Sequence, residues 1–243
     1  MSRSYLVVDD NVAFAENLAE ILRDAGAEVE IARSGIEALR LIEVRRFDAM
    51  VTDMRMPLMS GAELVREARH HDAGLPAIII TAYSRESDLR EAWRLGLLAV
   101  LPKPVPIVRL LELVARARRA GLVAMIEDDT DFADNLAEAL RERGFSAVTA
   151  GSVDEVAHFA GLTPFLALAD LRLPGGPDGE ALSRLRAGHP TLCTLVVTAY
   201  AHESSLPPGQ HVFEKPCDTG ALLGVIETVY AKSRLPARDE AGR

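Results

Sequence analysis

The sequence predicts an α/β protein made of two tandem doubly wound domains, each with a parallel sheet covered by helices. Three observations support this fold class. Short apolar runs alternate with segments of helical periodicity, which is typical of βαβ units. The pattern occurs twice, because Asn17-Leu18-Ala19-Glu20 returns as Asn135-Leu136-Ala137-Glu138, an offset of 118 positions (135 − 17). A period of this length is that of a whole domain rather than of a solenoid repeat.

The first copy contains five strand-like and five helix-like segments. Strands are expected near 5–9, 28–32, 47–52, 77–81 and 98–101, and helices near 12–24, 36–45, 62–69, 86–95 and 106–119. The runs at 47–52 and 77–81 are almost continuously apolar, as in strands buried on both faces, whereas residues 28–31 alternate as in an edge strand. These features favour the flavodoxin-like (βα)5 arrangement with strand order 2-1-3-4-5.

The second copy repeats the pattern with one difference. Strands are expected near 122–126, 145–149, 165–169, 193–198 and 211–213, and helices near 131–142, 153–160, 179–187 and 219–231. From Thr198 to Lys215 there are 17 steps (215 − 198), against 22 (103 − 81) from Thr81 to Lys103. The shorter interval also contains Leu-Pro-Pro-Gly at 206–209, which cannot continue a helix. The fourth helix of the second domain is therefore predicted to be shortened or missing.

The domain boundaries follow from the two copies. We expect domain 1 over residues 1–120, domain 2 over 121–232 and a polar tail over 233–243. Helix 106–119 is expected to meet strand 122–126 through Ala120-Gly121. So short a connection favours a fixed mutual orientation of the two domains.

Composition and charge narrow the function classes. The chain has 243 residues, of which 49% are hydrophobic and 26% charged, as in an ordinary globular protein with two cores. Its apolar runs have the length of strands rather than of membrane spans, and Asp9 interrupts any signal-peptide core, so a cytoplasmic location without membrane insertion is expected. Net charge is −1 for residues 1–120 (17 basic, 18 acidic) and −8 for 121–243 (10 and 18), which argues against direct nucleic-acid binding.

Acidic, hydroxyl and basic side chains stand at the carboxyl ends of the predicted strands. In the first copy they are Asp9, Asp10, Asp53, Thr81 and Lys103, and in the second Glu127, Asp128, Asp170, Thr198 and Lys215. The carboxyl ends of parallel strands face one crevice, so each set is expected to converge. Crowded carboxylates repel one another unless a cation is present, and oxygen ligands of this kind suit Mg²⁺.

The order of these motifs resembles receiver domains of two-component response regulators, here two in tandem without an output domain. The resemblance covers nearly the whole chain and includes an Asp followed four residues later by Pro (Asp53/Pro57, Asp170/Pro174) and a Lys-Pro pair whose peptide bond is commonly cis in this family. It implies these roles: Asp53 and Asp170 as phosphoacceptors; Asp10 and Asp128 as direct Mg²⁺ ligands; Asp9 and Glu127 as acids holding metal-bound water; the backbone carbonyls of Arg55 and Arg172 as further metal ligands; Thr81 and Thr198 as switch residues; Lys103 and Lys215 as phosphoryl partners.

The function that this resemblance implies is phosphorylation-controlled binding. A sensor histidine kinase or phosphotransfer protein would donate the phosphoryl group to Asp53 and also to Asp170, and the aspartyl phosphate would alter binding of a downstream protein target. The protein would not be an enzyme, although it would assist its own phosphorylation and dephosphorylation; a homodimer is possible. Alternatives left open are a non-phosphorylated receiver-fold scaffold, a phosphate sink and, ranked last, a phosphatase.

Each residue also has a structural interpretation. Asp10 and Asp128 could cap the helices that follow them, and the two Thr residues could be plain strand formers. The joint order of the motifs, found twice, favours the functional interpretation. Two departures concern output: valine (Val100, Val212) stands three residues before each Lys, where receivers usually carry Tyr or Phe, and Tyr83 and Tyr200 follow the Thr residues instead. We expect Asp53 to be the principal acceptor and the second domain to act as a modulator.

Overall fold

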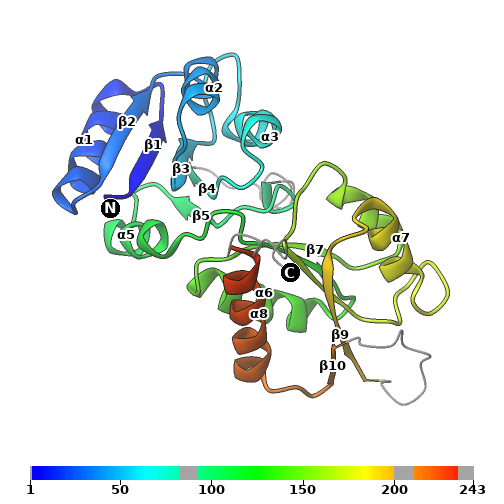
Figure 1. Ribbon diagram of the computed structural model, residues 1–243. Helices are drawn as coiled ribbons and strands as arrows, with labels where there is room; N and C mark the ends of the chain where they lie inside the picture. Colours follow the sequence, from blue (N-terminus) through cyan, green and yellow to red (C-terminus); the bar gives the residue numbers. More distant parts are fainter. Residues whose placement is uncertain (1, 83–91, 200–210, 235–243) are drawn as a thin grey trace, which may run out of the picture.

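The computed structural model describes residues 2–82, 92–199 and 211–234, and Figure 1 shows two α/β units side by side. The first unit runs from β1 to α5 and the second from β6 to α8. The first comprises β1 (Ser4–Val8), α1 (Val12–Asp24), β2 (Glu28–Ala32), α2 (Gly35–Val44), β3 (Ala49–Asp53), α3 (Gly61–His71), β4 (Ala77–Thr81), β5 (Ala99–Pro102) and α5 (Ile107–Arg116). The second comprises β6 (Leu122–Ile126), α6 (Thr130–Glu142), β7 (Ser146–Ala150), the 3₁₀ helix η1 (Asp154–Phe159), β8 (Leu166–Ala169), α7 (Glu180–Gly188), β9 (Cys193–Thr198), β10 (His211–Glu214) and α8 (Thr219–Ser233).

Each unit is built on one parallel five-stranded sheet. The strand orders are β2-β1-β3-β4-β5 and β7-β6-β8-β9-β10, so the predicted order 2-1-3-4-5 is confirmed in both. In the first sheet Asp53 pairs with Ile80 and Thr81 pairs with Pro102. This register places the ends of β3, β4 and β5 at one rim of the sheet.

Helices cover both faces of each sheet, which makes the units doubly wound. In the first unit Leu18 and Leu22 of α1 share a buried cluster with Leu110 and Val114 of α5. The opposite face is covered by α2 and α3. In the second unit α6 and α8 cover one face, while η1 and α7 cover the other. All residues of β3 and β4 are buried, as their continuous apolar pattern predicts.

Two helices differ from the sequence prediction. The segment expected as an α-helix over 153–160 is the six-residue 3₁₀ helix η1. Its start is held by the Val153 N–H, which donates to the Pro174 carbonyl at 3.0 Å, and Gly161 with φ +81° follows it. The segment between these two points is short enough for 3₁₀ geometry to compete with an α-helix.

The helix expected over 106–119 ends at Arg116, three residues early. The Arg118 N–H donates to the Gly144 carbonyl of the second unit at 2.9 Å, instead of to a carbonyl one turn earlier in α5. Arg118 also places its guanidinium 4.6 Å from the ring centre of Phe145. Contact between the two units therefore competes successfully with helix propagation, and α5 and α6 lie side by side.

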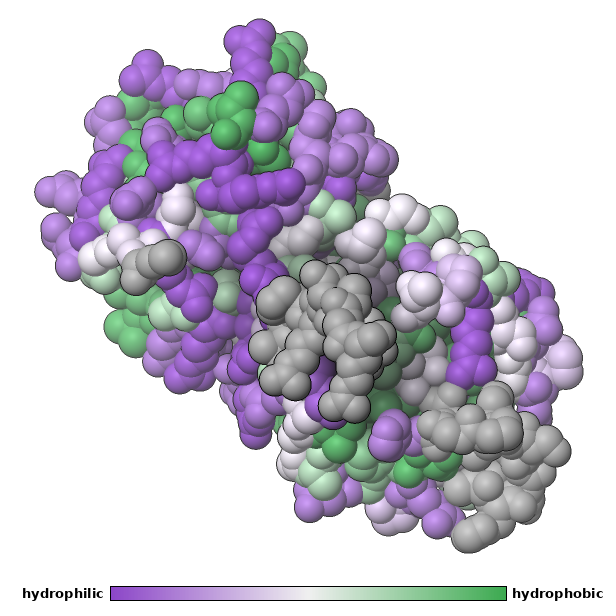
Figure 2. Space-filling model, in the orientation of Figure 1, coloured by the Kyte–Doolittle hydropathy of each residue, from purple (hydrophilic) through white to green (hydrophobic). Residues whose placement is uncertain are grey.

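Several predictions fall on residues outside the described ranges. Most of the fourth helix predicted for the first domain (86–95) lies there. So do residues 200–210, where the second domain is predicted to have a shortened or missing helix, and the tail after Arg234. None of the helices within the described ranges has the length and hydrophobicity that a membrane span requires. Figure 2 shows the two units as two lobes, and on this face most of the first unit's surface is hydrophilic.

Candidate functional site

The predicted site residues of the first unit lie at one rim of its sheet. Asp9 follows β1, Asp53 ends β3, Thr81 ends β4 and Lys103 follows β5. Asp9, Asp53 and Thr81 are buried. The rim is therefore a site that four separate segments of the chain build together.

Lys103 brings two of the acids together. Its Nζ lies 2.6 Å from Asp53 Oδ1 and 3.0 Å from Asp9 Oδ2. Burial disfavours the charged ammonium, but its hydrogen bonds to Asp53 and Asp9 outweigh this, and the pKa of Lys103 is raised. The Lys103–Pro104 peptide bond is cis, as is Lys215–Pro216 in the second unit.

Asp9 is a carboxylate in an unfavourable environment. Only 2% of the residue is exposed, and burial raises the pKa of its carboxyl above the ordinary value, although hydrogen bonds from the Asn11 N–H and from Lys103 oppose the shift. The Asn11 N–H donates to Asp9 Oδ1 at 2.8 Å. A positive charge close to Asp9 is thus part of what keeps the site stable.

Asp10, which follows Asp9 in the chain, is exposed. It does not cap α1, because Asn11 occupies the N-cap position and its side chain accepts the Phe14 N–H at 3.1 Å. Within the described residues Asp9, Asp10 and Asp53 do not form a three-carboxylate group close enough to share one ion. The structural interpretation of Asp10 as a helix cap is therefore wrong, and these three carboxylates are less closely grouped than their counterparts in the second unit.

The Asp53 side chain is fixed by the loop that follows β3. The Arg55 N–H donates to Asp53 Oδ2 at 2.5 Å. Gly61 at the start of α3 approaches so closely that a Cβ there would lie 2.2 Å from the Asp53 carbonyl oxygen. Only glycine fits such an approach, so α3 begins directly behind the acid. The Lys103 N–H donates to the Thr81 carbonyl at 2.8 Å, which joins the ends of β4 and β5.

The second unit repeats the arrangement with a closer acidic group. Lys215 Nζ lies 2.6 Å from Glu127 Oε2 and 2.8 Å from Asp170 Oδ2. Glu127, Asp128 and Asp170 each offer a carboxylate oxygen, and these oxygens lie within 4.8 Å of one another. Hard oxygen ligands in this number suit Mg²⁺, so the donor set fits the ion.

The acids of the second unit are held in the same way as those of the first. Burial raises the pKa of Glu127, against the lowering effect of Lys215. Asp170 Oδ1 accepts the N–H groups of Leu171 at 2.6 Å and Arg172 at 3.3 Å. Asp129 is the N-cap of α6, so Asp128 does not cap that helix and joins the acidic group instead.

One contact at each site was missed by the sequence prediction. The Phe14 ring centre lies 4.2 Å from Lys103 Nζ, and the Phe132 ring centre lies 5.0 Å from Lys215 Nζ. An aromatic face attracts an ammonium at this range. The signal was available, because Phe14 and Phe132 are separated by the same 118 positions (132 − 14) as the repeated motif.

Four residues depart from the usual receiver pattern near the Thr and Lys of each site, and two of them lie within the described ranges. Tyr83 and Tyr200 lie outside the described residues. Val100 is half-buried and, like Trp93, packs against a core cluster of the first unit, whereas Val212 lies in the exposed edge strand β10. Thr81 and Thr198 are both buried at the ends of their strands.

A family model described as the response regulator receiver domain matches residues 5–115. Response regulator receiver protein Anae109_2439 of Anaeromyxobacter sp. (strain Fw109-5) is 58% identical over 228 residues, which cover 94% of this chain and 95% of that protein. Response regulator MprA of Mycobacterium ulcerans (strain Agy99) is 37% identical over 149 residues, 61% of this chain and 62% of that protein. Among solved structures, a response regulator receiver domain protein (CheY-like) from Methanospirillum hungatei JF-1 has 32% identity and a TM-score of 0.46, covering 47% of this chain and 92% of that chain.

Proposed function

The chain belongs to the response regulator receiver family, and we propose that Asp53, and also Asp170, accept a phosphoryl group whose arrival changes protein–protein binding. The family model matches the first unit, whereas the second is assigned by its fold. One observation carries the proposal: each unit holds a buried Asp whose carboxylate is paired with a Lys that also contacts a second acid.

The chemistry in the first unit begins with the Asp53 carboxylate. An oxygen of Asp53 attacks the phosphorus of a phosphohistidine, a P–O bond forms, and the P–N bond breaks with its electron pair leaving on the imidazole. Lys103 then offsets the negative charge on the phosphoryl oxygens. Because Lys103 Nζ already lies 2.6 Å from Asp53 Oδ1, it needs little movement to serve the product.

Mg²⁺ would supply further neutralisation of the phosphoryl charge when bound. In the second unit Glu127, Asp128 and Asp170 would hold it, with the Arg172 carbonyl as a further ligand. In the first unit the corresponding residues are Asp9, Asp10, Asp53 and the Arg55 carbonyl, and their three carboxylates would have to draw closer together than they lie in the resting protein. Divalent cation binding is therefore expected to be tighter in the second unit of the resting protein.

Thr81 and Thr198 are proposed as the switch residues. A phosphoryl group carries a charge of about −1.5 to −2 and offers new acceptors, toward which a hydroxyl at the neighbouring strand end can turn. Thr81 is buried at the end of β4, next to the end of β3 where Asp53 lies. Its movement would displace the chain that follows β4.

The two acceptors are proposed to have different roles. We assign the principal signalling role to Asp53 and a modulating role to Asp170, because the interval between Thr198 and Lys215 is five residues shorter (22 − 17) than its counterpart. The phosphoryl donor would be a sensor histidine kinase or a phosphotransfer protein in the cytoplasm, and the output a downstream protein target. The units would act as domains 1–120 and 121–232, joined at Ala120-Gly121.

The direct test is labelling with acetyl phosphate and Mg²⁺, followed by mass spectrometry of peptides from each unit. Wild type should gain a phosphoryl group on Asp53 and, more slowly, on Asp170. Asp53→Asn and Asp170→Asn should each abolish one label, while the exposed Asp24→Asn serves as the matched control. No label on either unit, with or without Mg²⁺, would contradict the proposal, and exclusive labelling of Asp170 would reverse the division of roles.

A second measurement separates the remaining candidates. A non-phosphorylated scaffold should show no spectral or stability change with beryllofluoride and Mg²⁺, whereas a phosphoacceptor should be stabilised. A phosphate sink would be labelled but would bind its protein targets equally well in both states. A phosphatase would turn over an unrelated phosphoester repeatedly.

A further inference from the structure

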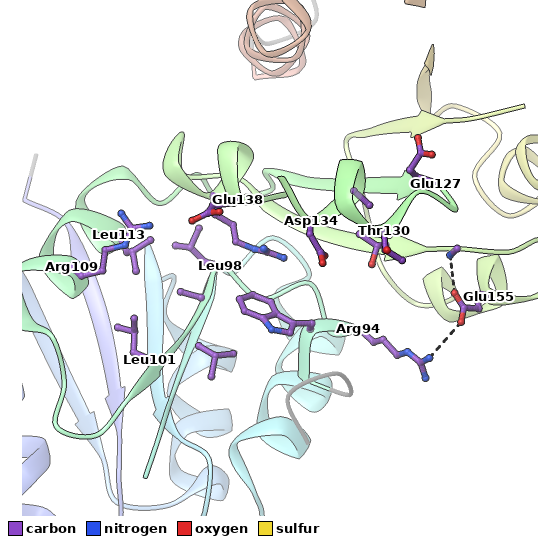
Figure 3. A pocket seen from close by; sticks show the side chains of 17 residues that line it. Arg94, Leu98, Leu101, Arg109, Leu113, Glu127, Thr130, Asp134, Glu138 and Glu155 are labelled. Carbon is purple, nitrogen blue, oxygen red and sulfur yellow. Dashed lines mark hydrogen bonds and ion pairs between the residues drawn. The ribbon is translucent and has the colours of Figure 1, made fainter. Parts of the chain in front are cut away.

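A cleft of about 710 Å³ lies between the two units (Figure 3). One side is formed by residues 93–94, by β5 and by α5 of the first unit. The other side is formed by α6, by Glu127 and by the turn around residues 151–155 of the second unit. The cleft therefore connects the β5–α5 face of the first unit with an acid of the second unit's site.

Two side-chain contacts cross this cleft. The Arg141 guanidinium of α6 lies 4.0 Å from the ring centre of Trp93. Arg94 Nη2 lies 3.7 Å from Glu155 Oε1, and a dashed line in Figure 3 marks this pair. Both contacts involve two adjacent residues of the first unit, so a movement of Trp93 and Arg94 would disturb both at once.

The contact between Arg141 and Trp93 buries a polar group of Arg141 without a hydrogen-bond partner in the described part of the chain. Its Nε–H is buried and has no hydrogen-bond acceptor among the described residues. Burial lowers the pKa of Arg141 to about 10, although Asp134 and Glu138 partly offset this. A buried donor without a partner opposes the arrangement that buries it, so movement of Arg141 away from Trp93 would let this N–H reach water.

The first unit's site is linked to this contact through β5. The Thr81 carbonyl accepts the Lys103 N–H at 2.8 Å, and Thr81 pairs with Pro102 at the end of β5. Two residues earlier in β5, Val100 lines the cleft and packs in the same core cluster as Trp93. A shift of Thr81 and Lys103 toward a phosphoryl group on Asp53 would therefore move the strand that supports Trp93.

The second unit's site is linked to the contact through Glu155. Glu155 Oε2 accepts the Gly151 N–H at 2.8 Å, which shapes the turn after β7. The residue before that turn, Ala150, accepts the Glu127 N–H at 2.9 Å. Glu127 in turn holds Lys215, the partner of Asp170. Arg94 thus contacts a turn that lies beside the second acidic site.

We propose that the second unit is itself the protein partner bound by the β5–α5 face of the first unit, and that phosphorylation of Asp53 loosens this contact and speeds phosphorylation of Asp170. The inference rests on the function proposed above. Loosening would widen the cleft beside Glu127, the acid that holds Lys215 in the second site, and so expose that site to a phosphoryl donor. The two acceptors would then be loaded in sequence within one chain.

Trp93 provides the first readout, because it is the protein's single tryptophan. Full-length Asp170→Asn, which keeps only the first acceptor, is treated with beryllofluoride and Mg²⁺. Its tryptophan emission should move to longer wavelength and become more accessible to acrylamide. The same treatment of Asp53→Asn should leave the emission unchanged.

The second readout is the rate at which acetyl phosphate labels Asp170. It should be at least about fivefold slower in Asp53→Asn than in wild type, the lower end of typical coupling between sites. In Arg141→Met, Asp170 should be labelled quickly, whether Asp53 is present or is replaced by Asn in the same chain. Arg143→Met, whose side chain contacts Glu227 within the second unit, is the matched control and should behave as wild type. Glu155→Gln replaces Arg141→Met should that variant not fold.

The outcomes separate the inference from the function on which it rests. Labelling of Asp53 without a change in tryptophan emission or in the Asp170 rate overturns the inference and leaves the proposed function intact. Failure of Asp53 to be labelled overturns the principal acceptor role proposed for it and the inference with it, and failure of both Asp53 and Asp170 overturns the proposed function as a whole. Faster Asp170 labelling in Asp53→Asn would show coupling of the opposite sign and also overturn the inference.

Discussion

At the scale of single residues, the aromatic ring beside each site lysine is a feature with a testable effect. Phe14→Leu removes a ring centre 4.2 Å from Lys103 Nζ, and Phe132→Leu removes one 5.0 Å from Lys215 Nζ. A cation–π contact contributes about 1 kcal/mol, which corresponds to about a fivefold slower phosphorylation. Mass spectrometry of acetyl phosphate labelling checks the rate at each Asp.

The two variants control for each other. Phe14→Leu should slow the labelling of Asp53. Phe132→Leu, which changes the second site itself, should slow the labelling of Asp170. Circular dichroism confirms that both variants fold. Unchanged labelling of Asp53 in Phe14→Leu would show that the ring packs against the lysine without assisting the reaction.

At the scale of elements, the helix ends before β2 and β7 differ although they are repeats of one another. Gly26 and Gly144 are 118 residues apart (144 − 26) and both have positive φ, +89° and +84°. A Cβ on Gly26 would meet nothing within 4 Å, whereas one on Gly144 would lie 1.8 Å from the Arg116 carbonyl oxygen at the end of α5. The second glycine is therefore required by the junction as well as by its own turn.

This difference predicts unequal stability losses. Gly26→Ala should lower the free energy of unfolding by about 1 kcal/mol, the cost of a left-handed alanine. Gly144→Ala should lose about 2 kcal/mol more, because α5 and α6 must also move apart. Urea titration followed by circular dichroism measures both. Equal losses would mean that the junction adapts to the extra methyl group without strain.

At the scale of the whole molecule, Arg119 ties the linker to both units. Its guanidinium donates to the buried Asp72 of the first unit at 2.6 Å, and its carbonyl accepts the Tyr230 hydroxyl of the second unit at 2.8 Å. The Asp72 carboxylate is only 4% exposed, so it depends on its charged partners. Arg119 therefore joins an internal charge of one unit to a helix of the other.

Removing this side chain should weaken the first unit and its junction. Arg119→Met should destabilise the protein by about 2 kcal/mol, less than a complete loss of a buried partner because Arg46 stays 3.1 Å from Asp72. The more exposed Arg46→Met is the matched control and should cost less than about 1 kcal/mol. Urea titration gives the energies, and small-angle X-ray scattering should show a larger radius of gyration for Arg119→Met only. An unchanged radius would assign the orientation of the units to other contacts.

Much of the fold could be predicted from the sequence, because strand and helix periodicities record which residues are buried locally. The continuous apolar runs at 47–52 and 77–81 correspond to β3 and β4, and the strand order is confirmed in both units. The sequence also placed Asp9, Asp53 and Lys103 at strand ends, and the structure brings these three together. Their roles in phosphoryl transfer remain predictions.

Only the tertiary structure decided how the two units meet. Trp93 and Arg141 belong to different copies of the repeat, and no periodicity within either copy signals that they touch. The same holds for the early end of α5, where a hydrogen bond to Gly144 replaces one within the helix. Local patterns determine which face of an element is buried in its own sheet, whereas docking depends on side chains that match across a surface after both units have folded.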